Sequence, residues 1–512
     1  MAQASPSGAF LPKENPASSR AQAAGGQAPV SLGRHLGILA TVAPERLALV
    51  LKRPGQADAT LTYRELDRRA NQAARLLAER GVDKTSRIAL ALPNCLDYFV
   101  ATYAIWRLGA CVFPLRADLP AWERNRLFEV AGPSHVIGSF DELAQPQIRP
   151  EDLADLARFA TEPLPDLIAH PYKMNATGGS TGIPKIVVRL EPGLAGADTP
   201  LANTASRALP GSEVQINLGP LYHYGPARNA FAALGAGHTL VLFDKFDPVL
   251  VLESIQAYRV RLLSLVPTML YRLIQLPGVE RYDVSSLERV ALGGSKCADW
   301  VFEKALQIFG ADVLWVAYGG TESIGTVSAP GREWLTHRGT CGRPLMTDLR
   351  IQDAEGNVLP PGEVGEIWMR PQAGFVTEYL GAPMRKSQDG FASLGDLGWL
   401  DEEGYLYIAD RRKDLIVSGG ANVYPAEVEA VLLEHPEVVD SAVVGVADPE
   451  WGARVHAIVV PAEGARIDPE TLKAFCKARL AAYKVPKSFS CMDALPRDGL
   501  GKLRRSALPV DA

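Results

Sequence analysis

A short run of glycines and hydroxyl residues, closed by a lysine, has the composition of an anion-binding loop. It reads Thr177-Gly178-Gly179-Ser180-Thr181-Gly182-Ile183-Pro184-Lys185. Glycines let backbone N–H groups approach an anion, hydroxyls add donors, and the lysine adds positive charge. The run differs from the GxxxxGK[ST] phosphate loop, because Pro184 precedes the lysine and no Ser or Thr follows it. We predict a polyphosphate-binding loop, with a flexible surface loop as the alternative.

Two further segments carry a carboxylate that could bind a metal ion or a sugar. Tyr318-Gly319-Gly320-Thr321-Glu322 follows the apolar stretch 313–316, which we predict to be a strand. At a strand end Glu322 could hold Mg²⁺, although a helix start with Thr321 as N-cap explains the same residues slightly better when they are taken alone. In Gly395-Asp396-Leu397-Gly398 the acid could accept hydrogen bonds from both hydroxyls of a ribose. A plain turn is the simpler interpretation of that segment alone.

Two basic segments lie towards the C-terminus. The charge run Asp410-Arg411-Arg412-Lys413-Asp414 would normally be a solvated linker, but it falls where the composition changes. Further on, Pro496-Arg497-Asp498-Gly499-Leu500-Gly501-Lys502 presents a lysine on a glycine-rich turn. A mobile lysine can approach a carboxylate and a phosphate together and offset the negative charge that opposes their reaction. The alternative is a basic tail.

Hydrophobic periodicity predicts the elements that must position these residues. A capping box at Thr62 and Glu65 begins a helix that ends at Gly81. A strand over 88–92, a helix over 97–108 and a strand over 110–115 follow, which predicts a parallel α/β sheet. The same alternation returns after residue 210, with strands over 239–243 and 262–266. Short strands with glycine turns over 347–368 predict a small β subdomain.

The block after Arg411 predicts a separate domain. It contains a helix over 425–434, strands over 441–446 and 455–460, and a helix over 468–480. We predict an α/β fold in which residues 31–411 form a large N-terminal domain of two α/β subdomains and a small β subdomain. Residues 412–512 form a small α+β C-terminal domain. Residues 1–30, rich in Ala, Ser, Pro, Gly and Gln, are predicted to be a disordered tail.

Composition excludes several classes of function. A chain of 512 residues with 47% hydrophobic residues is long enough for more than one core. Its 58 acidic and 53 basic residues form no basic stripe, so a nucleic-acid partner is not expected. No apolar stretch reaches the roughly 18 residues of a membrane span. Six cysteines without a CxxC pair predict reduced thiols in a cytoplasmic protein.

Together and in this order, the segments resemble the adenylate-forming superfamily of acyl-CoA synthetases, peptide-synthetase adenylation domains and luciferases, over roughly residues 35–508. The resemblance implies that Thr177 to Lys185 bind phosphate, that Tyr318 to Glu322 contact adenine and Mg²⁺, and that Asp396 binds the ribose. It implies that Arg411 contacts the ribose and phosphate, and that Lys502 is required for adenylation.

Other matches imply a moving C-terminal domain and a gated acyl pocket. Lys413 takes the hinge position about which that domain turns between two half-reactions, and residues 418–425 resemble the segment that the turned domain brings to the site. His223 resembles the gating residue beside the acyl pocket. Two further core motifs match: Val266-Pro267-Thr268 and Gly293-Gly294-Ser295.

The chain also departs from the family pattern. Gly178 stands where many relatives have serine, and Ser180 where threonine is commoner, but both keep the loop small. No Phe-Asp pair occurs over 218–223, where amino-acid-activating domains use an aspartate to hold the substrate ammonium. We therefore expect an acid without an α-amine. Aromatic and small apolar residues over 222–229, 293–296 and 315–325 favour a cyclic or aromatic acid.

The resemblance implies an enzyme that uses ATP and Mg²⁺ to convert a carboxylic acid to acyl-AMP and pyrophosphate. The acyl group then passes to CoA, slightly favoured as the commoner acceptor. An amine or amino acid is the close alternative, because the TGGSTG loop and Leu221-Tyr222-His223-Tyr224-Gly225 resemble the amide synthetases related to coronafacic acid ligase. A non-catalytic nucleotide-binding relative is disfavoured, since Lys502, Glu322, Asp396 and Arg411 are all present.

Overall fold

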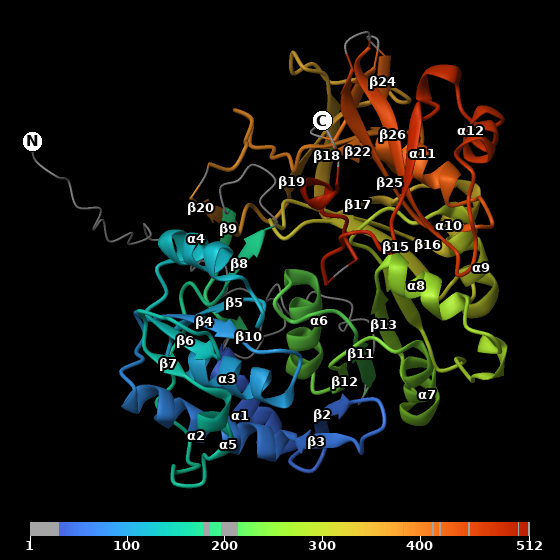
Figure 1. The fold of residues 1–512 in the computed structure, drawn as a ribbon. Coiled ribbons are helices and arrows are strands. Elements are labelled where there is room, and N and C mark those ends of the chain that lie inside the picture. Colours follow the sequence, from blue (N-terminus) through green and yellow to red (C-terminus); the bar gives the residue numbers. More distant parts are fainter. Residues whose placement is uncertain are drawn as a thin grey trace, which may run out of the picture.

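The computed structural model describes residues 30–177, 185–195, 213–381, 383–411, 414–418, 421–448, 451–499 and 501–509. Figure 1 shows a large N-terminal part, coloured from blue through yellow to light orange, and a smaller C-terminal domain, in deeper orange and red, on one side of it. The predicted disordered tail, apart from Val30, lies outside the described residues. No helix in the described ranges is both long and apolar enough to cross a membrane.

The first α/β layer is built around a parallel sheet of order β5-β4-β6-β7. Its strands are β4 (Arg87–Ala91), β5 (Cys111–Pro114), β6 (His135–Gly138) and β7 (Gln147–Ile148). Its helices are α1 (Leu32–Val42), α2 (Tyr63–Glu79), α3 (Leu96–Arg107), α4 (Ala121–Ala131) and α5 (Pro150–Ala154). The predicted capping box begins α2: Thr62 accepts a hydrogen bond from the Glu65 backbone at 3.2 Å, and Glu65 accepts one from the Thr62 backbone at 2.7 Å.

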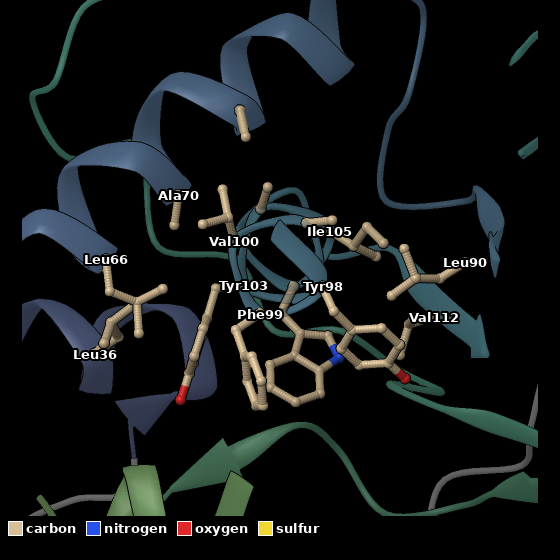
Figure 2. Close-up of a cluster of buried hydrophobic side chains, with 14 of the residues drawn as sticks. Leu36, Leu66, Ala70, Leu90, Tyr98, Phe99, Val100, Tyr103, Ile105 and Val112 are labelled. Atoms are coloured by element: carbon tan, nitrogen blue, oxygen red, sulfur yellow. The ribbon is translucent and has the colours of Figure 1, made fainter. Parts of the chain in front are cut away.

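Helix α3 is buried on every side and joins this layer to the next. Figure 2 shows its Phe99 and Tyr103 packed with Leu36 of α1 and Leu66 of α2. The ring centroid of Phe99 lies 5.2 Å from that of Phe231, which belongs to α6 of the second layer. Aromatic contacts of this kind add to the burial of apolar area. They fix the position of α6, whose first turn enters the candidate site.

The second layer is a mixed sheet of order β17-β16-β15-β14-β13-β11-β12-β2-β3. Its strands are β2 (Leu47–Lys52), β3 (Ala59–Thr62), β11 (Val214–Asn217), β12 (Thr239–Phe243), β13 (Leu262–Leu265), β14 (Arg289–Leu292), β15 (Leu314–Gly319), β16 (Thr326–Pro330) and β17 (Arg343–Leu345). Its helices are α6 (Tyr224–Gly235), α7 (Pro248–Tyr258), α8 (Pro267–Ile274), α9 (Asp299–Phe309) and α10 (Gly331–Thr336). The six neighbouring strands β15, β14, β13, β11, β12 and β2 run parallel, so their carboxyl ends share one edge of the sheet.

Antiparallel strands form the β part of the N-terminal domain. One sheet has the order β20-β9-β8 and contains β8 (Met174–Thr177), β9 (Lys185–Arg189) and β20 (Thr377–Leu380). The other has the order β18-β19-β21-β22 and contains β18 (Thr347–Gln352), β19 (Gly365–Pro371), β21 (Asp396–Leu400) and β22 (Leu406–Arg411). The strands β1 (Val30–Ser31) and β10 (Leu194–Ala195) pair separately.

The C-terminal domain is α+β, as predicted. Its elements are β23 (Ile416–Ser418), β24 (Ala421–Val423), α11 (Pro425–Leu432), β25 (Val438–Asp448), β26 (Gly452–Pro461), α12 (Pro469–Lys477) and β27 (Ser488–Cys491). The helices pack on β25 and β26 around a core of its own, which includes Val428, Val443 and Leu472. The predicted fold class, a large α/β domain followed by a small α+β domain, is therefore confirmed.

Candidate active site

The predicted motifs gather at the carboxyl edge of the large sheet. His223 follows β11, Thr268 follows β13, Gly293 follows β14 and Glu322 follows β15. The chain order reverses between β11 and β13, because β12 lies on the other side of β11. In open α/β sheets such a reversal leaves a crevice where ligands bind.

The glycine-rich turn that carries Lys502 is docked on this edge. A Cβ added to Gly501, which has φ +73°, would overlap the Thr268 hydroxyl, and one added to Gly499 would lie 2.8 Å from Cγ of Pro220. The turn is closed by two hydrogen bonds of 2.9 Å: Lys502 N donates to Asp498 Oδ1, and Asp498 N donates to the Lys502 carbonyl. Glycine thus allows the C-terminal domain to approach the edge closely.

His223 lies beside this docked turn. Its Nε2 atom is buried and has no hydrogen-bond partner among the described residues. Burial lowers the pKa of His223 to about 4, a shift that the charge of Asp498 opposes and that of Lys502 reinforces. The imidazole is therefore neutral near pH 7. It offers a hydrogen-bonding atom to a group that enters the crevice.

A second group of residues joins β15 to β21 and β22. The Tyr318 hydroxyl donates to Asp396 Oδ2 at 2.8 Å, and Arg411 Nε lies 3.2 Å from Asp396 Oδ1. Burial, and then the charge of Asp396, raise the pKa of the Tyr318 phenol well above its usual value. Asp396 is the first residue of β21, so the plain turn considered from the sequence is wrong. Each of its oxygens keeps a lone pair for a further donor such as a sugar hydroxyl.

Glu322 and Lys185 come together around a tyrosine. The Tyr379 hydroxyl on β20 donates to Glu322 Oε1 at 2.5 Å, and Lys185 Nζ lies 5.5 Å from the Tyr379 ring centroid. The Thr377 hydroxyl also donates to the Glu322 carbonyl. Residues 320–325 form a turn between β15 and β16, so the alternative of a helix capped by Thr321 is wrong. The sequence did not identify Tyr379 and Thr377, because β20 pairs with β9 across almost two hundred residues and no local pattern marks them.

Two glycines leave room for close contacts beside β14. Gly294 has φ +91°, a left-handed conformation that favours glycine, and a Cβ on it would lie 3.4 Å from Val266 Cγ1. A Cβ on Gly293 would lie 3.2 Å from the Ala317 carbonyl. A side chain at either position would contact these neighbouring residues.

The residues present fit a magnesium ion whose ligands come mainly from the phosphates of a bound nucleotide. No group of three His, Cys, Asp or Glu side chains suited to a metal is found in the described ranges. Mg²⁺ usually takes one or two protein carboxylates together with phosphate oxygens and water, and Glu322 supplies one. Several predicted site residues lie outside the described residues: Gly178, Gly179, Ser180, Thr181, Gly182, Lys413 and the pair Gly419-Gly420. The backbone of Thr177 ends β8.

Comparison with known proteins identifies the family. The family model described as AMP-binding enzyme matches residues 39–380, and the model of the AMP-binding enzyme C-terminal domain matches residues 427–502. The chain therefore belongs to the AMP-binding enzyme family and is an AMP-forming ligase. The resemblance inferred from the sequence and the predicted enzyme class are confirmed.

Relatives with similarity along almost the whole chain include enzymes named as CoA ligases and an enzyme named as an amide bond synthetase. The 2-succinylbenzoate–CoA ligase of Bacillus licheniformis is 32% identical over 92% of this chain and 98% of its own. The o-succinylbenzoate CoA synthetase of Bacillus subtilis, solved with its acyl-adenylate, superposes with a TM-score of 0.81 at 29% identity over 95% and 99% of the two chains. An amide bond synthetase from Marinactinospora thermotolerans gives a TM-score of 0.78 at 27% identity over 93% and 98%.

One buried lysine next to this site should reduce the stability of the fold. Lys173, just before β8, is 5% exposed, and burial lowers its pKa from 10.5 to about 7, with a further contribution from the charge of Arg189. Below pH 10.5 the unfolded chain keeps this proton, whereas the folded chain releases it above about pH 7. The unfolded state therefore binds more protons between these values, and stability rises with pH there.

Lys173→Met should therefore raise the melting temperature by a few degrees near pH 7, because methionine fills similar volume without a charge. The difference from the wild type should shrink as the pH rises towards 10. Thermal unfolding of both proteins at pH 6.5, 8 and 9.5 measures it. A variant that is less stable at pH 6.5, or a difference independent of pH, would contradict the assignment.

Proposed function

We propose that the protein uses ATP and Mg²⁺ to join an aromatic or cyclic carboxylic acid to AMP, and then transfers the acyl group to CoA. The observation that supports this most is the docking of the Lys502 turn on Thr268 and Pro220, beside His223. It brings a lysine of the C-terminal domain to the carboxyl edge where Glu322 and Asp396 also lie. A lysine and a magnesium carboxylate are the charges that an attack of carboxylate on phosphate requires.

In the first half-reaction the substrate carboxylate attacks the α-phosphorus of ATP and pyrophosphate leaves. Lys502 would contact both the carboxylate and the phosphate and reduce their repulsion. Mg²⁺, held by Glu322, would neutralise phosphate charge. Asp396 and Arg411 orient the ribose. The loop from Thr177 to Lys185 holds the phosphates, while Gly293, Gly294, Ser295, Tyr318 and Gly319 border the adenine, with Thr321 beside Glu322.

In the second half-reaction a thiolate attacks the acyl carbon and AMP leaves. We propose that the C-terminal domain, residues 412–512, turns about Lys413 on the N-terminal domain, residues 31–411. The turn withdraws Lys502 and opens the crevice next to His223 to the thiol. The six free cysteines suit a reducing compartment, and we place the enzyme in the cytoplasm.

Transfer to an amine is the second candidate. It is supported by the similarity to the amide bond synthetase of Marinactinospora thermotolerans along almost the whole chain. The two candidates share the first half-reaction and differ in the acceptor alone. Both need His223 and the crevice to admit a nucleophile once acyl-AMP has formed.

Product analysis by mass spectrometry distinguishes the acceptors. The enzyme is incubated with ATP, Mg²⁺ and a panel of aromatic and cyclic acids, with either CoA or a mixture of amines and amino acids. We expect an acyl-CoA to form faster than any amide. Amide formation without CoA, faster than thioester formation with it, would assign the amide synthetase activity instead. AMP and pyrophosphate should accompany either product.

A further inference from the structure

Positively charged side chains surround Tyr224, the residue after His223. Lys173 and Arg189 are 5% and 3% exposed, and the Arg189 backbone N–H donates to the Lys173 carbonyl at 3.1 Å. Lys173 Nζ lies 5.7 Å and Arg189 Cζ 4.3 Å from the centroid of the Tyr224 ring. Met174 on β8 and Ile186 on β9 belong to a hydrophobic core. Lys173 is one residue away from Met174, and Arg189 is three residues away from Ile186, so each points to the other face of the sheet. The cations therefore lie on the opposite face, towards α6.

A third cation comes from α6 itself. Arg228 lies one turn after Tyr224 and thus on the same face of the helix. Burial lowers the pKa of the Arg228 guanidinium. Burial, and to a lesser extent the charge of Arg228, also lower the pKa of Arg189, so the two guanidiniums lie within electrostatic reach of each other. Figure 1 shows α6 between the large sheet and the strands β8 and β9 that carry the other cations.

Arg189 and Arg228, together with Lys173 below about pH 7, give this cluster more positive than negative charge. Arg189 Nη1 lies 3.4 Å from Glu191 Oε1, and its Nη2 donates to the Ser323 hydroxyl at 2.9 Å. Within the described ranges no carboxylate forms an ion pair with Lys173 or Arg228. Buried charges are normally paired, so this arrangement favours an anionic ligand. Planar guanidiniums match the two oxygens of a carboxylate especially well.

The cluster borders the proposed acyl site. The Ser323 hydroxyl donates to the Tyr224 hydroxyl at 3.2 Å, and Ser323 follows Glu322 directly. Ser323 has φ +49°, a left-handed conformation that is uncommon for serine and marks a locally imposed backbone. Tyr224 directly follows the proposed gate, His223, and Ser323, which accepts a hydrogen bond from Arg189, directly follows the proposed metal ligand, Glu322. Tyr224 and Arg228 also belong to residues 222–229, which the sequence predicts to border the acyl pocket.

We propose that Lys173, Arg189 and Arg228 bind a second carboxylate of the acid that the enzyme activates. This inference rests on the proposed function and specifies its substrate class: an aromatic acid with one carboxylate for activation and another for recognition. A phosphate group of ATP has similar chemistry and is the other possible anion. We favour the acid, because Lys185 and Lys502 already supply cations for phosphate.

The test measures kcat/KM for acid-dependent pyrophosphate release with matched acids. One set compares 3-phenylpropanoate with its ortho-, meta- and para-carboxy derivatives, and another compares 4-oxo-4-phenylbutanoate with 2-succinylbenzoate. The wild type should prefer at least one diacid over its monoacid by about tenfold or more, since charge-assisted hydrogen bonds are strong. Lys173→Met and Arg228→Met should each bring that ratio to within about twofold of one while monoacid turnover is retained.

The matched control is Arg124→Met. Arg124 is also 5% exposed and lies 5.1 Å from an aromatic ring, but the ring is that of Phe140. This variant should keep the wild-type ratio. Thermal unfolding and turnover of the monoacid show that each variant is folded.

Three results would overturn the inference. They are a wild type that prefers the monoacid in every pair, an unchanged ratio in both Met variants, or a KM for ATP that rises equally with mono- and diacids. The last result would mean that the cluster binds a phosphate group of ATP. A wild type that releases pyrophosphate with none of the acids would instead contradict the proposed function.

Discussion

Lys502→Ala should lower the rate of acyl-AMP formation by about two to three orders of magnitude, the usual effect of removing one charge that stabilises a transition state. The docked turn brings Lys502 beside His223 at the carboxyl edge of the large sheet. Acyl transfer from supplied acyl-AMP should stay within about threefold of the wild type, because the proposed turn of the C-terminal domain has withdrawn Lys502 from the site before that step. Pyrophosphate release and single-turnover product formation measure the two steps.

The control for this variant is Lys473→Ala on α12. Lys473 belongs to the same domain and forms an exposed pair with Glu470, with 3.3 Å between Nζ and Oε1. Exposed pairs contribute little to stability, so both half-reactions should be unchanged. If Lys502→Ala impaired both half-reactions to the same extent, the lysine would have a structural role.

Gly501→Ala should impair the first half-reaction and spare the second, because the added methyl group disturbs the docking of the turn without removing a catalytic group. Its Cβ would overlap the Thr268 hydroxyl, so the C-terminal domain could no longer dock on the edge that follows β13. Adenylation should fall about tenfold or more, a loss typical of a misplaced catalytic group. Acyl transfer from supplied acyl-AMP should persist, because the proposed second arrangement moves this turn away. The double variant Gly501→Ala with Thr268→Ala should recover much of the lost rate.

Gly464→Ala is the matched control for backbone strain. Gly464 has φ +77°, close to the +73° of Gly501, but nothing lies within 4 Å of a Cβ added to it. Alanine costs about 1–2 kcal/mol in this left-handed conformation at either position. Both variants should therefore lose similar stability, while only Gly501→Ala loses adenylation. Equal activity losses would show that strain, and not docking, causes the effect.

Much of the fold follows from local sequence signals. The capping box at Thr62 begins α2, and the strand predicted over 239–243 is β12 without a change of limits. Other limits moved by one to three residues, as at α12, which the structure ends at Lys477. Helix ends fray and depend on tertiary contacts, so such differences are ordinary.

The site was predictable where it follows parallel strands, and not where it depends on pairing between distant strands. Glu322 comes directly after an apolar strand, and the carboxyl ends of parallel strands share an edge. Tyr379 reaches Glu322 because β20 pairs with β9, with Tyr379 opposite Val187. Register between strands so far apart is set by tertiary packing. The cluster of buried cations around Tyr224 also depends on tertiary packing, so no local sequence pattern predicts it.

Isotope exchange tests the central claim most directly. The full-length protein is incubated with ATP, Mg²⁺, labelled pyrophosphate and each acid of the panel, without an acyl acceptor. Reversible formation of acyl-AMP predicts that label enters ATP only when a suitable acid is present, and that Lys502→Ala reduces this exchange by about two orders of magnitude or more. Absence of exchange with every mono- and diacid, or exchange that Lys502→Ala leaves unchanged, would contradict the account.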